Sequence, residues 1–96
     1  AGVRELGPGD TAAAALALRE LRTHFPDAGA LVAAADAQRA EGYRLVASFE
    51  DGEQDAAAVG GFRVQTMLAH GRFLYVDDFV CRASHRRRGH GRAVMD

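Results

Sequence analysis

The chain has 96 residues, 48% of them hydrophobic and 26% charged, and its formal net charge is −1. This length allows one small domain, and the composition is too apolar and too evenly charged for a disordered segment. The charge excludes a uniformly basic nucleic-acid binder, and no apolar run approaches the roughly 20 residues of a membrane span. With one cysteine and no visible signal peptide, the protein is expected to be cytoplasmic.

The first part of the chain predicts a strand and a helix. Residues 3–6 alternate in polarity, as a short strand does. Asp10 or Thr11 then offers a capping oxygen for a helix over residues 12–25. Pro26 is expected to end this helix, because proline disfavours helical geometry in the residue before it.

A second helix is predicted over residues 28–41. Asp27 precedes it as an N-cap, and Gly42 follows it, where glycine often ends a helix. Its apolar face is mostly alanine, so we expect it to pack closely while burying little area per residue.

The pattern then changes to alternation, which predicts three antiparallel strands at residues 43–49, 56–68 and 73–82. The third strand is apolar on both faces, so it is expected to be central and covered on both sides. Its predicted faces are Phe73, Tyr75, Asp77, Phe79 and Cys81 on one side, and Leu74, Val76, Asp78 and Val80 on the other.

Glycines mark two features of these strands. Gly60 and Gly61, inside the second strand, predict a bulge or a close backbone approach. Residues 69–72 predict the turn between the last two strands.

Charge is unevenly distributed along the chain. In the segment 82–96 the acidic residue is Asp96, whereas the earlier part of the chain contains many acidic residues, such as Glu50 and Glu53. Its basic residues are Arg82, His85, Arg86, Arg87, Arg88, His90 and Arg92. A nearly neutral chain therefore has one strongly positive end.

The run Arg86-Arg87-Arg88-Gly89-His90-Gly91 lies between the third strand and a helix expected over residues 92–96. Such a loop directs several backbone N–H groups to one place, and a helix N-terminus and the arginines add positive charge. The glycines leave room for a close approach. These features predict an anion site suited to a pyrophosphate. A Walker loop is excluded because lysine is absent, and a dinucleotide fingerprint needs glycine or alanine where Val94 stands.

The pattern Arg86-x-x-Gly89-x-Gly91, after the strand Asp78-Phe79-Val80-Cys81, resembles the acyl-CoA loop of the GNAT superfamily of N-acetyltransferases. The expected element order agrees with that family from its first strand to the start of its third helix. The resemblance implies an α/β (α+β) fold of the acyl-CoA N-acyltransferase type, with a mostly antiparallel mixed sheet flanked by helices. Residues 1–96 would form one domain, the N-terminal two thirds of the family's domain, truncated after the pyrophosphate-binding loop and without a complete active site.

The resemblance also implies an activity, the transfer of an acetyl group from the co-substrate acetyl-CoA to a primary amine that attacks the thioester directly. The Phe79 amide would polarise the thioester carbonyl, and main-chain groups of Phe79 and Cys81 would pair with the pantetheine arm. The amides of residues 87–92 would hold the pyrophosphate, with the amide of His90 mattering more than its ring. The implied cofactor-binding residues are Phe79, Val80, Cys81, Arg86, Arg87, Arg88, Gly89, His90, Gly91 and Arg92.

The group that takes the amine proton is less well defined. Some family members carry a base at the position of Tyr75, which is tyrosine here. Asp77 and Asp78 remain the catalytic candidates, and each could instead be a polar residue near a strand end. The family's general-acid tyrosine lies beyond residue 96, and neither Tyr43 nor Tyr75 matches it by motif.

Other interpretations compete with this one. Tyr75 favours a non-catalytic CoA sensor or interaction module on the same fold. Nucleic-acid binding is disfavoured because no aromatic residues alternate with the arginines, and no membrane contact is expected. Cys81 is expected to be a small core residue, and the histidines lack the spacing of a metal site, so no metal is expected. Uncovered sheet edges make a homodimer possible.

Overall fold

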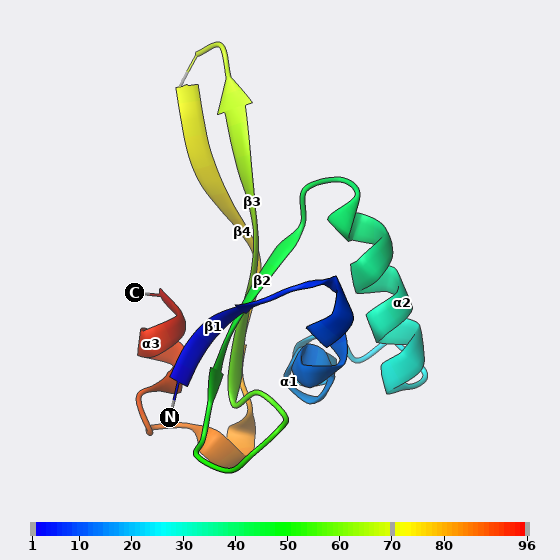
Figure 1. Ribbon diagram of the computed structural model, residues 1–96, viewed down its shortest axis with the longest axis vertical. Helices are drawn as coiled ribbons and strands as arrows, with labels where there is room; N and C mark the ends of the chain where they lie inside the picture. Colours follow the sequence, from blue (N-terminus) through cyan, green and yellow to red (C-terminus); the bar gives the residue numbers. More distant parts are fainter. Residues whose placement is uncertain (1, 70, 96) are drawn as a thin grey trace.

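The computed structural model describes residues 2–69 and 71–95. Four strands form one antiparallel sheet in sequence order, namely β1 (Gly2–Leu6), β2 (Arg44–Phe49), β3 (Ala58–Met67) and β4 (Gly71–Cys81). The helices are η1 (Pro8–Ala14), α1 (Ala15–Leu21), α2 (Ala28–Arg39), η2 (Ala83–His85) and α3 (His90–Met95). Helices α1 and α2 lie on one face of the sheet and α3 on the other (Figure 1). The predicted order of elements is confirmed.

The hairpin of β3 and β4 extends beyond both helical layers (Figure 1). Its turn was expected at residues 69–72, of which His70 lies outside the described residues. The last predicted helix, over residues 92–96, is observed from His90 onward, and Asp96 lies outside the described residues.

The first helix begins differently from the prediction. The chain enters it through the 3-10 helix η1, whose N-cap position is held by Gly7 without a side-chain hydrogen bond. Thr11 lies inside η1 and is buried, and its hydroxyl donates to Asp36 on α2 at 2.6 Å. Neither Asp10 nor Thr11 therefore caps a helix, because Thr11 is used to join η1 to α2.

The same helix also ends earlier than predicted. It stops at Leu21, and Arg22 leaves helical geometry with φ −108° and ψ 76°. The Arg22 guanidinium binds Asp78 on β4, with its Nη2 at 2.7 Å from the carboxylate. Pro26 is consequently not the residue that ends the helix, since the chain has already turned toward the sheet.

The second helix agrees with its predicted start. The Asp27 side chain accepts a hydrogen bond from the Ala30 amide at 2.8 Å, as an N-cap does. The helix ends at Arg39 instead of the predicted residue 41. Gly42 follows with φ +93°, a left-handed conformation that glycine adopts without steric cost.

The core lies between the sheet and the pair α1 and α2. Its large side chains are leucines, the valines Val59 and Val80, and Tyr43, and alanines let the backbones approach closely. The buried members include Leu6, Leu18, Leu31, Leu45 and Val59, with Ala14, Ala17, Ala35 and Ala47 between them. Full burial of one leucine or valine contributes about 1.5–3 kcal/mol.

The predicted close approach at the glycine pair is confirmed on both faces of β3. A Cβ on Gly61 would overlap the ring of Tyr43, and one on Gly60 would lie 2.9 Å from a methyl group of Val94. The absence of a side chain at Gly61 thus leaves room for the Tyr43 ring, and its absence at Gly60 allows α3 to pack against the sheet.

The bulge lies opposite that glycine pair. Gly61 is paired with Asp78, whereas Phe62 is paired with Val76, so Asp77 is an extra residue in β4. A bulge re-aims the neighbouring side chains. The predicted alternation along this strand is therefore wrong, because it assumed an unbroken register.

The consequence is that both aspartates face α1 and α2. Asp78 meets Arg22 and Tyr43, and Asp77 meets Arg63, which also bonds Gln38 of α2. Beyond the bulge, Phe79 faces the opposite side, where its ring lies against Gly91 of α3. Asp77 and Phe79, predicted on one face, lie on opposite faces.

The position of β4 also differs from the prediction of a central, covered strand. It is the last strand of the described sheet and has one neighbour, β3. Leu74, Tyr75 and Phe79 are 58%, 56% and 42% exposed. The apolar side chains of β4 are therefore partly exposed in the described part of the chain, and periodicity alone does not predict whether a strand is covered.

Candidate active site

Two aspartates at the β4 bulge are each held by an arginine. Asp78 accepts hydrogen bonds from the Arg22 guanidinium and, at 2.6 Å, from the Tyr43 hydroxyl. Asp77 accepts one from Nε of Arg63 at 2.6 Å, which raises the pKa of Arg63. Burial and then the Asp78 carboxylate raise the pKa of Tyr43 above its ordinary value of 10.0, so the phenol stays protonated and acts as a donor.

A cavity of about 190 Å³ opens beside Asp78, between α1, α2 and β4. Its lining comprises Leu18, Arg22, His24, Phe25, Leu31, Ala34, Ala35, Gln38, Tyr43 and Asp78. A larger cavity of about 370 Å³ lies on the α3 face of the sheet and is apolar apart from Glu5. Because it lacks a second polar side chain, we place the candidate chemistry at the smaller one.

The loop between β4 and α3 presents backbone donors. Arg87 and Gly89 have positive φ, at 66° and 83°. The Ala93 amide donates to the Gly89 carbonyl at 3.0 Å, which is the first hydrogen bond of the helix. The N–H groups of residues 90–92 belong to the first turn and therefore have no acceptor within the helix. Within residues 2–69 and 71–95 these three amides also have no backbone acceptor outside α3.

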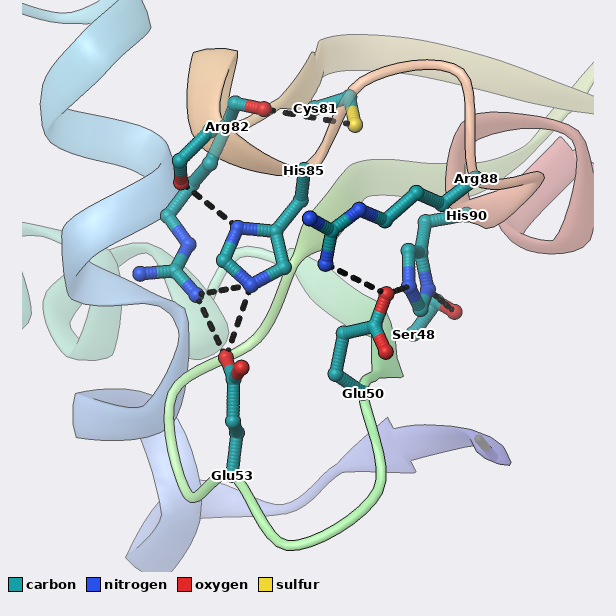
Figure 2. Close-up of polar contacts among 9 residues, drawn as sticks. Ser48, Glu50, Glu53, Cys81, Arg82, His85, Arg88 and His90 are labelled. Carbon is teal, nitrogen blue, oxygen red and sulfur yellow. Dashed lines mark hydrogen bonds and ion pairs between the residues drawn. The ribbon is translucent and has the colours of Figure 1, made fainter.

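The His90 ring is directed toward Ser48 and Glu50 (Figure 2). It is 4% exposed, with Nδ1 at 2.6 Å from the Ser48 hydroxyl and Nε2 at 2.9 Å from Glu50. Arg88 also binds Glu50, at 3.2 Å. Hydrogen bonds from His90 and from Arg88 lower the pKa of Glu50 below its ordinary value of 4.5. The first residue of α3 is therefore tied to the end of β2.

A second histidine, His85, is tied in the same manner (Figure 2). Its Nε2 lies 2.9 Å from Glu53 and its Nδ1 lies 2.7 Å from the Ser84 hydroxyl. Arg82 reaches the same Glu53 oxygen at 3.0 Å. The segment between β2 and β3 thus binds the β4–α3 loop through two glutamates, Glu50 and Glu53.

Solved structures of acetyltransferases superpose on the chain. A ribosomal-protein-alanine N-acetyltransferase from Brucella melitensis matches with a TM-score of 0.80 and 20% identity, over 100% of this chain and 67% of that one. A putative acetyltransferase from Agrobacterium tumefaciens gives 0.73 and 26%, over 99% and 68%. A GNAT family acetyltransferase from Staphylococcus aureus gives 0.78 and 12%, over 98% and 71%. No protein-family model and no curated protein sequence matches the chain.

The chain has the fold of the GNAT acetyltransferases. The acyl-CoA N-acyltransferase fold that the loop motif implied is confirmed, and the chain spans about two thirds of these solved structures. The order of one strand, two helices and three antiparallel strands before the glycine loop is thus a GNAT order.

In this GNAT fold the free edge of β4 leads into the glycine loop. The Arg82 amide donates to the Ala57 carbonyl beside β3, at 2.8 Å. Successive residues of a strand direct their backbone groups to opposite edges, so Val80 points toward β3 as Arg82 does. Phe79 and Cys81 consequently direct their N–H and C=O groups to the free edge, where the sequence predicted the pantetheine arm.

The remaining predicted residues have mixed positions. Val80 is buried, so its contribution there is limited to the main chain. Cys81 is half-buried, and its carbonyl is reached by Nε of Arg86 at 3.4 Å. Tyr75 is exposed on β4 before the bulge. The glycine loop therefore contacts the end of the strand through Arg86, whereas Tyr75 belongs to the projecting hairpin.

Some arginines around the glycine loop form ion pairs and others do not. Arg82 pairs with Glu53 and Arg88 with Glu50, so part of the positive charge that the sequence predicted here is balanced. Arg87 and Arg92 are exposed and have no acidic partner in the described part of the chain.

Sequence reasoning missed the roles of Glu50 and Glu53. The signal for them is charge complementarity, since the acid-rich segment 50–55 and the arginine-rich segment 82–92 have opposite signs. Nothing in their spacing says which acid meets which base, because the two segments are brought together by the pairing of β2, β3 and β4.

In the described part of the chain, no helix combines the length and apolar character needed to cross a membrane.

Proposed function

We propose that the protein is an N-acetyltransferase that moves an acetyl group from acetyl-CoA to a primary amine. The observation that carries this proposal is the junction of the free β4 edge with the glycine loop. The strand that ends at Cys81 leads through η2 into the glycine loop, and Nε of Arg86 in that loop lies 3.4 Å from the Cys81 carbonyl. An extended, amide-containing arm that ends in a diphosphate fits both parts. We assign residues 1–96 to one domain.

The residues where β4 meets the glycine loop fit the coenzyme A part of acetyl-CoA. Gly89 has open space where a Cβ would stand, and a Cβ on Gly91 would press on the Phe79 ring at 3.4 Å. The loop amides would hold the diphosphate, and Arg87 and Arg92, which pair with no acid among residues 2–69 and 71–95, would add charge. Arg86 would release the Cys81 carbonyl, which then accepts a hydrogen bond from an amide of the arm.

The chemistry needs a polarised carbonyl and a neutral amine. Acetyl-CoA supplies an acetyl thioester, and the Phe79 N–H at the strand edge would stabilise the oxyanion that develops on its carbonyl oxygen. The amine nitrogen forms the new C–N bond, the C–S bond breaks to release CoA as a thiolate, and the nitrogen loses a proton. Asp78 is our first candidate to receive that proton, directly or through water, because it lines a cavity. Asp77 is the second.

Calorimetric titration with CoA tests the binding half of the proposal. We expect saturable binding that Gly89→Glu abolishes, because a carboxylate would then occupy the anion loop. No binding, or binding that this substitution leaves unchanged, would contradict the proposal. A matched control is Gly52→Glu, since Gly52 also has positive φ and open space but lies in the β2–β3 turn.

An assay for free thiol with a panel of amines tests the catalytic half. Release of CoA that depends on the amine supports acetyl transfer. A non-catalytic CoA-binding module is the second candidate, and the arginine partners of both Asp77 and Asp78 favour it. Tight CoA binding without turnover of any amine would select that second candidate. Sedimentation of the same samples tests the proposed homodimer.

A further inference from the structure

The buried ring of His90 has no role in the acetyl transfer proposed above. His90 lies within the glycine loop, and its ring is 4% exposed and directed toward the end of β2 (Figure 2). Nδ1 lies 2.6 Å from the Ser48 hydroxyl, and Nε2 lies 2.9 Å from Glu50. Because these contacts occupy both ring nitrogens, the ring can influence ligand binding only through the backbone of the loop.

The two hydrogen bonds of this ring have complementary donors and acceptors. The Glu50 carboxylate accepts, so Nε2 carries a proton, and in the neutral ring Nδ1 then accepts from the Ser48 hydroxyl. Ser48 is 2% exposed and lies in β2. A buried polar atom that loses its partner is not compensated by water. Removal of the Ser48 hydroxyl would therefore leave Nδ1 unpaired and would favour another orientation of the ring.

Glu50 holds the loop on both sides of Gly89. Its Oε1 accepts from Nε2 of His90 at 2.9 Å and from Nη1 of Arg88 at 3.2 Å. Gly89 has φ 83°, and no heavy atom lies within 4 Å of the position that a Cβ would take. Glycine is the most flexible residue, and packing does not restrain it here. The conformation of the loop therefore depends on the contacts of the two residues beside the glycine.

The apolar packing of α3 does not replace these hydrogen bonds. Val94 lies one turn after His90, and one of its methyl groups lies against Gly60 of β3. Burial of apolar surface is non-directional, so Val94 holds α3 against the sheet without fixing its rotation. Hydrogen bonds require a defined distance and angle. The direction of the loop amides is consequently set by the contacts of His90.

We propose that Ser48 and Glu50 are positioning residues for CoA, which act through His90 to hold the glycine loop in the conformation that receives the diphosphate. This inference rests on the CoA binding proposed above. A loop that is already held in its bound conformation loses less conformational freedom when the ligand arrives, so its affinity is higher. The effect is confined to the diphosphate, because the pantetheine arm would lie along β4.

The first experiment compares two serines that each place a hydroxyl beside Nδ1 of a histidine. Ser48 lies beside His90, whereas Ser84 lies beside His85, before the loop amides. In calorimetric titration with CoA, Ser48→Ala should bind at least about fivefold more weakly than the parent, and Ser84→Ala within about twofold of it. Circular dichroism checks that both variants are fully folded at the temperature of the titration.

A second ligand separates positioning from a general structural role. Pantetheine lacks the diphosphate and does not use the loop amides. NMR titration with pantetheine should give affinities for Ser48→Ala and Ser84→Ala within about twofold of the parent. A variant with a generally distorted site would lose affinity for both ligands.

Glu50 offers a comparison at a single position. Glu50→Gln and Glu50→Ala both remove the negative charge, but the glutamine amide oxygen keeps an acceptor for Nε2 of His90. Glu50→Gln should therefore bind CoA at least about fivefold more tightly than Glu50→Ala. Because the two variants have the same net charge, the difference reports the hydrogen bond and not the attraction of the diphosphate to a more positive protein.

The outcomes separate this inference from the proposed function. Failure of the parent to bind CoA overturns both. CoA binding by the parent that Ser48→Ala and Ser84→Ala leave equally strong overturns the positioning role while the proposed function stands. Equal losses for CoA and pantetheine in Ser48→Ala overturn it as well. If Ser48→Ala does not fold, the comparison of Glu50→Gln with Glu50→Ala decides, and equal CoA affinities of those two variants reject the positioning role.

Discussion

His85 and His90 make the same pair of hydrogen bonds, with ring centroids 6.3 Å apart. Each places Nε2 at 2.9 Å from a glutamate and Nδ1 beside a serine hydroxyl, and each is buried, at 8% and 4% exposure. A carboxylate oxygen accepts, so the contact with Glu50 places a proton on Nε2 of His90, whereas Nε2 of His85 also lies 3.2 Å from the Arg82 guanidinium. The two differ in position, because His90 begins α3 among the loop amides whereas His85 precedes them.

This likeness provides a matched test of loop positioning. His90→Gln should reduce CoA affinity by at least about tenfold, because the loop amides lose their tie to Ser48 and Glu50. His85→Gln should reduce it by less than about threefold, although both variants remove one buried histidine. Calorimetry measures the affinities, and urea unfolding measures the stability that each variant loses. Equal losses of CoA affinity would mean that His90 contributes to folding alone.

Glu50 makes the free energy of unfolding depend on pH. Its pKa is lowered in the folded protein, first by the hydrogen bond from His90 and then by the one from Arg88. A group with a lowered folded pKa adds stability above its unfolded value of 4.5, and loses that contribution as the pH falls through the folded value. Glu50→Gln should therefore be less stable than the parent near neutral pH, and the difference should shrink as the pH falls below 4.5 and vanish only below the folded pKa of Glu50. Urea unfolding along a pH series checks this, and a constant difference would contradict it.

Gly61→Ala should destabilise the protein by about 1–3 kcal/mol, as overpacking of a filled core does. The added Cβ would overlap Tyr43, which is 5% exposed and has little room to move. Gly9→Ala is the control, because nothing lies within 4 Å of its Cβ position. Urea unfolding compares the two, and equal stability would show that Tyr43 adjusts.

Tyr43→Phe keeps the ring and removes one donor to Asp78. We expect a loss of about 1.5–3 kcal/mol in folding stability, the usual range for a hydrogen bond to a charged group. Acetyl transfer should fall as well, since the Asp78 carboxylate would be held by Arg22 alone. Tyr75→Phe is the control, because Tyr75 is 56% exposed on the hairpin. If both variants transfer acetyl groups at the parent rate, the Tyr43 hydroxyl has no role in orienting Asp78.

Local signals in the chain were sufficient for the element order, the Asp27 cap and the glycine loop. Each depends on neighbours in sequence: a capping oxygen acts within three residues, and strand alternation has a period of two. The likeness of Arg86-x-x-Gly89-x-Gly91 to an acyl-CoA loop pointed to the fold that the solved acetyltransferases share.

The face of each aspartate, the exposure of β4 and the partners of the loop arginines depended on contacts between distant segments. One extra residue at Asp77 shifts the register, and this reverses which side chains share a face. Arg22 leaves its helix to bind Asp78, which lies 56 residues further along the chain. Ion pairs and bulges of this kind arise when packing brings remote groups together, and the periodicity of a single segment carries no record of them.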